Sequence, residues 1–238
     1  MLEGQIQNSI LTRVAARFPL PNPPPHAVEG ANVMPKPINE ILVDGRGLEP
    51  PEPLERVLAA LDAMEVLRRN GIRVIIPPEQ VCCGSPLIRT GQLGFIETLK
   101  KRNIETFTSR GIYTVLTMCA GCGTTLKNDY QTPFRVIDIN ELLTQYGIEP
   151  PARLPIKATY HDPCHLLRGQ GIREQPRTLI RQVVDLVEMP SICCGSGGGV
   201  RSGNPKEAAD LGRRRGEEIQ KTGAEIVISS CPFCEFHI

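Results

Sequence analysis

Nine cysteines are the residues of this sequence best suited to chemistry, and eight of them form two matching groups. Each group has a Cys-Cys-Gly-Ser stretch and a Cys-x-x-Cys motif, with 35 or 36 residues between the second cysteine of the pair and the first cysteine of the motif. The first group is Cys82, Cys83, Cys119 and Cys122, and the second is Cys193, Cys194, Cys231 and Cys234. A Cys-x-x-Cys turn directs two thiolates at one point, which is how proteins bind zinc or iron. The duplicated spacing therefore predicts metal ligands rather than buried structural thiols.

The ninth cysteine extends the second group. In Tyr160-His-Asp-Pro-Cys164-His165 we expect a strand to end and Asp162 to cap a helix with Pro163 in its first turn. Cys164 would then lie at a helix N-terminus, where the dipole favours the thiolate. Five thiols exceed what one tetrahedral zinc or one cubane needs, so a polynuclear iron–sulfur site is favoured. Zinc bound by four of them remains an alternative.

Adjacent cysteines point apart in regular structure, so each pair needs a sharp turn. Gly84 and Gly195 follow the two pairs and permit a positive φ that brings both sulfurs to one site. The glycine run 195–199 matches no phosphate-binding motif. We expect it to wrap a metal site with backbone N–H groups directed at sulfur.

The two cysteine groups belong to a longer repeat. Cys-Cys-Gly-Ser recurs 111 positions later, Cys-x-x-Cys recurs 112 positions later, and Gly111 corresponds to Gly223. Such self-similarity predicts two copies of one supersecondary unit, related by a pseudo-twofold axis.

Short apolar runs alternate with amphipathic stretches along the chain. Strands are expected at 41–43, 72–76, 112–118, 134–139, 157–160 and 225–229, and helices at 54–69, 92–108, 176–186 and 205–221. The alternation predicts an α/β fold of two pseudo-symmetric, Rossmann-like half-domains with mostly parallel strands, at 38–149 and 150–238. Residues 1–37 form a separate segment: an amphipathic helix at 3–18 and a proline-rich linker, either a docking arm or a helix folded onto its own domain.

Composition limits the classes of partner. The 238 residues are 40% hydrophobic and 22% charged, as in soluble globular proteins. The net charge of +1 gives no general attraction to nucleic acid or anionic membrane. No apolar run reaches the roughly 18 residues of a spanning helix, and no signal peptide is evident. We therefore expect a cytoplasmic protein in a reducing compartment, with no direct membrane span.

The duplicated pattern, with a leading cysteine after a strand, resembles the cysteine-rich CCG domain. That domain occurs in the B and D subunits of heterodisulfide reductase, in the B subunit of thiol:fumarate reductase, and in iron–sulfur subunits of glycolate and lactate oxidation systems. The resemblance covers about residues 72–238, and the stretches 118–130 and 161–168 look most like the methanogen reductases.

The resemblance implies a function and a cofactor. In that family each five-cysteine set holds a noncubane [4Fe-4S] cluster, at which the CoM–CoB heterodisulfide is thought to be cleaved. The implied cluster ligands here are Cys164, Cys193, Cys194, Cys231 and Cys234. The chain has no flavin or nicotinamide fingerprint, so an iron–sulfur, flavin or cytochrome subunit would supply electrons, and the substrate would be a small thiol or disulfide. Two alternatives are an electron-relay subunit of a fumarate- or hydroxy-acid-linked complex and a zinc-stabilised interaction module.

The sequence departs from the family pattern in two places. No cysteine precedes Cys82, and the position after the strand at 41–43 reads Asp44-Gly45-Arg46. The first site therefore has four thiols, which suit a [4Fe-4S] cluster or zinc. The sequence also stops four residues after Cys234, where family members usually continue, so we expect a truncated or divergent member.

Other charged residues have both a functional and a structural interpretation. Arg89 and Arg201 follow the cysteine pairs and can bind an anionic substrate or offset cluster charge, although a structural role is favoured. His161 and His165 can donate protons at a pKa near 6.5, although packing or capping is favoured. The run Arg213–Arg215 is interpreted as a solvated helix face.

Overall fold

The computed structural model describes residues 40–43, 63–68, 70–147 and 152–238. In the first half, β1 (Glu40–Val43) lies between β2 (Arg73–Ile75) and β3 (Thr114–Thr117), and β4 (Arg135–Asp138) forms the outer edge. All pairs in this sheet are parallel. The expected segment 1–37 and most of the expected helix 54–69 lie outside the described residues; 63–68 are helical.

The second sheet repeats the first three strands in the same order. β5 (Lys157–His161) lies between β6 (Asp185–Val187) and β7 (Ile226–Ser229), again in parallel. The registers correspond too, because Val43 is paired with Leu116 and Tyr160 with Ile228. The expected α/β class with parallel strands is confirmed, whereas the half-domain boundaries stay a prediction.

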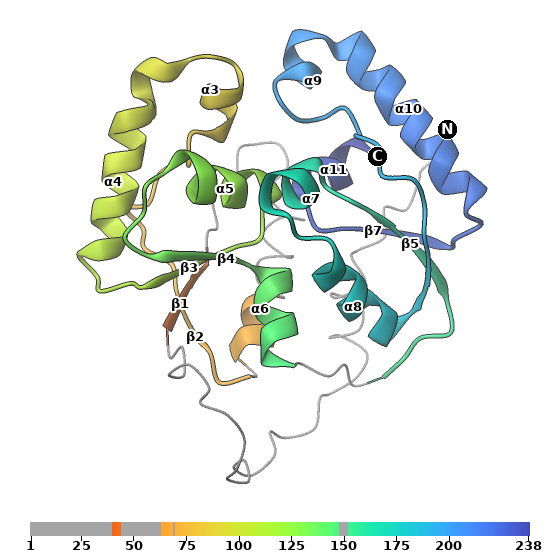
Figure 1. Ribbon diagram of the computed structural model, residues 1–238, viewed down its shortest axis with the longest axis horizontal. Helices are drawn as coiled ribbons and strands as arrows, with labels where there is room; N and C mark the ends of the chain where they lie inside the picture. Colours follow the sequence, from red (N-terminus) through yellow and green to blue (C-terminus); the bar gives the residue numbers. More distant parts are fainter. Residues whose placement is uncertain (1–39, 44–62, 69, 148–151) are drawn as a thin grey trace, which may run out of the picture.

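Besides the helical residues 63–68, eleven helical segments connect and follow the strands in the described part of the chain. In the first half they are α3 (Ser85–Arg89), the 3-10 turn η1 (Leu93–Phe95), α4 (Ile96–Thr108), α5 (Ala120–Thr124), the π-helical η2 (Thr125–Asp129) and α6 (Ile139–Tyr146). In the second half they are α7 (Cys164–Gln170), α8 (Glu174–Val183), α9 (Val200–Gly203), α10 (Pro205–Lys221) and α11 (Pro232–His237). Figure 1 shows α4 and α10 on opposite outer sides, with α5, α7 and α11 between them.

In the described residues two hydrophobic clusters fill the first half, one fills the second half, and a fourth combines residues of both halves. Leu116, Ile137 and Leu142 are buried in the first half, and Ala158 and Ile180 in the second. The central cluster combines residues of both halves with three cysteines: Ala120, Leu166, Ile172, Cys194, Cys231 and Cys234. The cysteine-bearing loops are therefore part of the packed interior.

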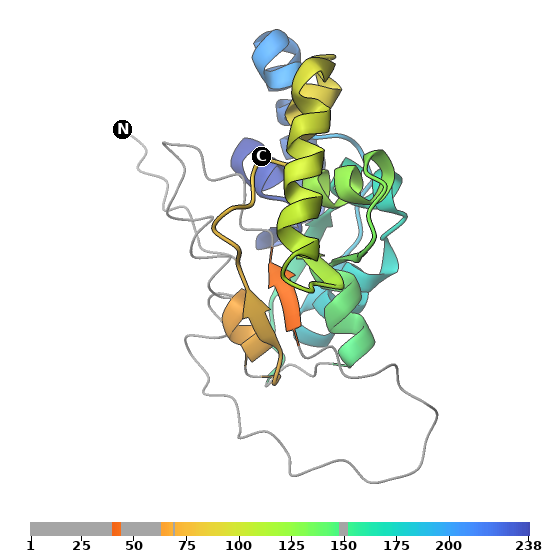
Figure 2. The same ribbon diagram turned by 90° about the vertical axis from the view of Figure 1, so that its left-hand side faces the viewer.

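The helices α5 and α7 pack against each other across the halves; they lie between α4 and α10 in Figure 1 and to the right of α4 in Figure 2. The Thr124 hydroxyl donates to the carbonyl of His165 at 2.6 Å, and the Gln170 amide donates to the carbonyl of Ala120 at 3.1 Å. A Cβ on Gly169 would lie 2.5 Å from Thr124 Oγ1, so only glycine permits this approach without a shift.

One helix prediction was wrong at its C-terminal end. The expected helix 176–186 begins earlier, at Glu174, and ends at Val183. Val184 is extended, and Leu186 belongs to β6, where it pairs with Ala158 of β5. The pairing with β5 outweighs the helical periodicity of these residues. Among the described residues, no helix has the length and apolar character needed to cross a membrane.

Candidate metal centre

The five cysteines of the second group come together at the carboxyl ends of β5 and β7. Cys164 is the first residue of α7, directly after β5, and Cys231 precedes α11, directly after β7. The Sγ atoms of Cys194 and Cys234 lie 3.5 Å apart. Cys164 hydrogen-bonds to Cys193, and Cys231 to Cys234, through their thiols. The sequence-predicted set is thus brought together, while its binding of metal stays a prediction.

The first group has the same geometry with one thiol fewer. The Sγ atoms of Cys83 and Cys122 lie 3.3 Å apart, and Cys119 hydrogen-bonds to Cys122. The backbone N–H of Gly84 points at Cys82 Sγ at 3.4 Å. The N–H of Gly195 points at Cys193 Sγ at the same 3.4 Å. Both loops direct backbone N–H groups at sulfur.

The glycine after each cysteine pair is required by its conformation. Gly84 has φ +79° and Gly195 has φ +91°, which confirms the expected positive-φ turn. A Cβ at Gly195 would lie 2.7 Å from Leu211 Cβ. The turn therefore also lets α10 approach the second group of thiols.

The two groups of cysteines touch each other where the two halves meet. The thiols of Cys119 and Cys231 are close enough to hydrogen-bond, although the residues are separated by more than a hundred positions. Cys231 is buried, and the adjacent Ala120 belongs to the central core cluster. The structure therefore joins the two sites into one continuous array of sulfur atoms.

Thiols this crowded cannot all lose their protons unaided. The hydrogen bonds that they donate to neighbouring sulfur atoms, and then burial, raise the pKa of Cys164 and Cys234, and raise that of Cys231 to about 12. The negative charge is concentrated on Cys119 and Cys193, whose pKa values the neighbouring thiols lower. A bound cation would remove this competition because it stabilises every thiolate at once. The donor set fits an iron–sulfur group.

Two expectations for the segment before Cys164 were wrong. Asp162 does not cap α7, because Pro163 occupies the N-cap position and the Asp162 carboxylate accepts two bonds from Arg177, at 2.7 and 2.8 Å. Both side chains are buried. Cys164 is not the favoured thiolate at this helix start, because its hydrogen bond with Cys193 leaves the charge on Cys193.

His161 lies inside the second group. Its side chain is only 1% exposed, and within the described residues neither ring nitrogen has a hydrogen-bond partner. A ring nitrogen and the Sγ atoms of Cys194 and Cys234 all lie within 4.8 Å of one another. Burial, and then the charge of Arg215, lower the pKa of His161 to about 4, so the expected value near 6.5 was wrong. His165 lies at the rim, with Nδ1 3.5 Å from Cys164 Sγ.

The two candidate substrate arginines are held by structural contacts. Arg89 pairs with Asp129 at 2.7 Å, and the Arg201 guanidinium lies 4.0 Å from the centroid of the Phe236 ring. These contacts agree with the structural interpretation, and a role in substrate binding stays a prediction for both.

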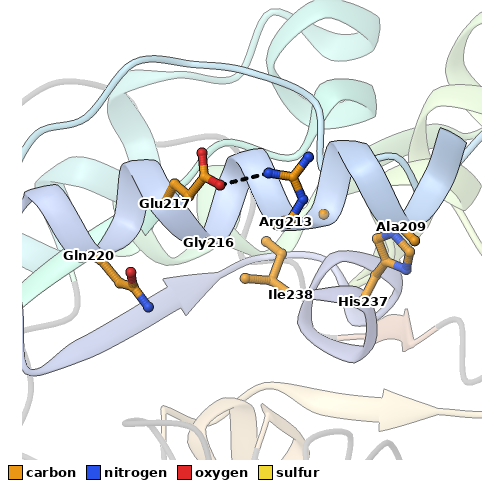
Figure 3. A pocket seen from close by; sticks show the side chains of 8 residues that line it. Ala209, Arg213, Gly216, Glu217, Gln220, His237 and Ile238 are labelled. Atoms are coloured by element: carbon orange, nitrogen blue, oxygen red, sulfur yellow. Dashed lines mark hydrogen bonds and ion pairs between the residues drawn. The ribbon is translucent and has the colours of Figure 1, made fainter.

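Arg215 is the residue that the sequence interpretation missed. Arg213 lines a recess between α10 and the C-terminal residues His237 and Ile238, where it pairs with Glu217 (Figure 3); its side chain is exposed, as expected of a solvated face. Arg215, however, is fully buried. Its burial could have been recognised from the sequence. Ala208, Leu211 and Arg215 are spaced three and four positions apart, so they share one face of the helix, and Ala208 on that face is buried in the core.

Comparison with known proteins supports the division of the cysteines into two groups. A family described as a cysteine-rich domain, CCG, matches residues 48–127 and 158–238, one match for each cysteine group. An uncharacterized iron-sulfur protein of Methanococcus maripaludis is 50% identical over 181 residues, covering 74% of this chain and 37% of that protein.

Two relatives have names that state an activity. The B subunit of fumarate reductase (CoM/CoB) of Methanothermobacter marburgensis is 47% identical, covering 74% of this chain and 37% of that protein. The D subunit of dihydromethanophenazine:CoB–CoM heterodisulfide reductase of Methanosarcina acetivorans is 35% identical, covering 76% of this chain and 49% of that protein. The chain thus spans about half or less of the length of these relatives.

Proposed function

The chain belongs to the family of the cysteine-rich CCG domain, and we propose that it is the iron–sulfur subunit of a thiol–disulfide oxidoreductase that reduces a small heterodisulfide of the CoM-S-S-CoB type. The observation that carries the proposal is the convergence of five thiols in the second half. Relatives that share about three quarters of this chain are named as reductase subunits, which supports redox work over a purely structural role.

The proposed ligands of a noncubane [4Fe-4S] cluster are the five thiols of the second half: Cys164, Cys193, Cys194, Cys231 and Cys234. When bound, such a cluster would supply single electrons and an iron site with affinity for sulfur. The surrounding residues support this assignment. Gly195 directs its N–H at Cys193, and the buried imidazole of His161 lies beside Cys194 and Cys234.

At the first site, the proposed ligands are Cys82, Cys83, Cys119 and Cys122, and they would bind either a [4Fe-4S] cluster or zinc. The contact of the first site with the second site through Cys119 and Cys231 suits a path for electrons from a partner subunit. The same contact favours the alternative function, an electron-relay subunit without substrate chemistry. Disulfide reduction by this chain with an artificial donor would distinguish the two.

Metal and acid-labile sulfide analysis with EPR on anaerobically purified protein tests the proposal. About four irons with matching sulfide, and a paramagnetic signal after oxidation with substrate thiol, would support one cluster at the second site. About eight irons would show that the first site also assembles a cluster. Zinc without sulfide would contradict the proposal and leave a zinc-stabilised interaction module.

A further inference from the structure

Arg215 is a buried cation without a carboxylate partner among the described residues. Its Nη1 donates to the carbonyl of Pro190 at 2.5 Å, and its side chain is fully buried. Nε and Nη2 have no hydrogen-bond partner in the described part of the chain. Burying an uncompensated charge is strongly unfavourable, so this guanidinium requires a source of negative charge that remains to be identified.

The charged groups around Arg215 identify that source. Asp162 contributes negative charge, but its carboxylate is already bound in bidentate fashion by Arg177. Glu218 also contributes. The remaining groups near the guanidinium are Cys194 and Cys234, and Leu211, one turn before Arg215 on α10, packs against Gly195, which follows Cys194. These two cysteines supply negative charge when they bind metal as thiolates. Both belong to the second cysteine group, and the neutral His161 lies beside them.

The first half has a neutral side chain at the corresponding position. Leu99 of α4 approaches Gly84 as Leu211 of α10 approaches Gly195, so the two helices correspond at an offset of 112 positions. The same offset places Asn103 at the position of Arg215.

Asn103 differs from Arg215 in being fully partnered. It is equally buried, and its amide accepts from the N–H of Val81 at 2.9 Å. It donates to the carbonyl of Cys82 and to the Tyr130 hydroxyl, both at 3.3 Å. The first site therefore needs no extra charge, whereas the second site has an unpaired buried cation.

We propose that Arg215 compensates the negative charge of the metal cluster at the second site. The second half thereby stabilises a metal centre with more negative charge than the metal centre of the first half. The charge difference matches the thiol difference, because the second site, near Arg215, has five thiols and the first site, near Asn103, has four. This inference rests on the proposed function, since it requires an anionic cluster at the second site.

The proposal has a direct redox consequence. A fixed positive charge stabilises the reduced, more negative state of a nearby group more than the oxidised state. Arg215 therefore raises the reduction potential of the second site, and it acts as a positioning and charge-compensating residue without contacting substrate.

The test is an EPR-monitored redox titration of the full chain, purified anaerobically, with three variants. R215M removes the charge and keeps much of the side-chain length, and R215K keeps the charge. R214M is the matched control, because Arg214 is an exposed neighbour on α10. For R215M we expect the ratio of reduced to oxidised cluster at fixed potential to fall at least about tenfold, which equals about 59 mV for a one-electron couple. R215K and R214M should remain close to wild type.

Each outcome decides the question. An unchanged potential in R215M overturns the inference and leaves the proposed function intact, whereas wild-type protein without iron contradicts the proposed function itself. If R215M binds no iron, the iron content of R215K becomes the measurement. Iron retained in R215K supports the counter-charge, and iron lost equally in R215K and R215M shows a packing role and overturns it.

Discussion

The two halves build the same loop around different chemistry. Both place a cysteine pair before a positive-φ glycine, and both bring the second thiol of the pair within 3.5 Å of a Cys-x-x-Cys thiol. They differ in what surrounds the sulfur atoms. The second half adds Cys164, His161 and Arg215, whereas the first half has the neutral Asn103. A duplicated scaffold can thus preserve a binding loop while the charge around it changes.

Sheet register shows where the halves diverge. Val43 and Tyr160 occupy equivalent positions in their sheets, because Val43 pairs with Leu116 and Tyr160 pairs with the corresponding Ile228. The residues that follow them in the sequence, Asp44 and His161, therefore also correspond to each other. The same count along the sequence aligns Gly47 with Cys164. The first half therefore lacks both the fifth thiol and the imidazole at the level of sequence.

The largest expected effect comes from removing equivalent thiols. Cys194→Ser should abolish the metal group of the second site and disulfide reduction with it, because Cys194 is in contact with three other members of that site. Cys83→Ser should remove only the metal of the first site. Iron, zinc and sulfide analysis of both variants measures this. Equal losses of the same metal in both would show that the thiols form one shared centre.

Breaking the buried ion pair beside Cys164 should have the next largest effect. Arg177→Met leaves the buried carboxylate of Asp162 unpaired and should lower the free energy of unfolding by about 3–5 kcal/mol. Arg181→Met is the control, because its exposed pair with Glu188 should contribute less than about 1 kcal/mol. Denaturant unfolding measures both. Equal effects would show that the bidentate pair has no special role.

The strand β4 has no counterpart in the second sheet among the described residues, and its last residue, Asp138, gives the first half a pH dependence. Burial raises the pKa of Asp138 from 3.8 to about 6. The protonated form is thus favoured in the folded protein, so its contribution is full below pH 3.8 and is lost as the pH rises through about 6.

Asp138→Asn should remove this dependence and stabilise the protein at pH 7 by up to about 3 kcal/mol. Asparagine keeps the cap of α6, where Asp138 accepts from the N–H of Asn140 at 2.9 Å. Thermal unfolding at several pH values measures the difference, which should grow from pH 5 to pH 7. A constant difference would show that Asp138 does not titrate in this range.

The smallest expected effect lies at the contact between the halves. Gly169→Ala places a methyl group against Thr124 and should destabilise the protein by about 1–3 kcal/mol through overpacking. The double variant with Thr124→Ser should recover part of the loss, because serine lacks the γ-methyl group that lies 2.8 Å from the new Cβ. Unfolding midpoints of the two variants provide the comparison. No recovery would locate the strain elsewhere.

Much of the fold could be predicted because its signals are local. The alternation of short apolar runs with amphipathic stretches, the glycines that end helices and the duplicated cysteine spacing are all visible in the sequence. The helix at 205–221 was predicted with the observed ends, since Pro205 begins it and Gly223 follows it. The grouping of eight of the nine thiols followed from the same repeat, and Cys164 was assigned from its place after a predicted strand.

What could not be predicted depends on contacts between distant segments. Leu186 fits a helical pattern but pairs with β5. Asp162 has the sequence context of a helix cap, yet it binds Arg177 fifteen positions later. Arg215 belongs to a run of three arginines, and only the packing of α10 against the second site distinguishes it from its exposed neighbours.

The close approach of α5 and α7 also restricts how the sequence can change over evolutionary time. Each helix presents a glycine to a side chain of the other, since a Cβ on Gly123 would lie 2.5 Å from Gln170 Nε2 and one on Gly169 would meet Thr124. A substitution on one helix is therefore accommodated only with a matching change on the other. Positions 123 and 170, and positions 124 and 169, should covary among relatives, so that the join between the two copies is inherited as a unit.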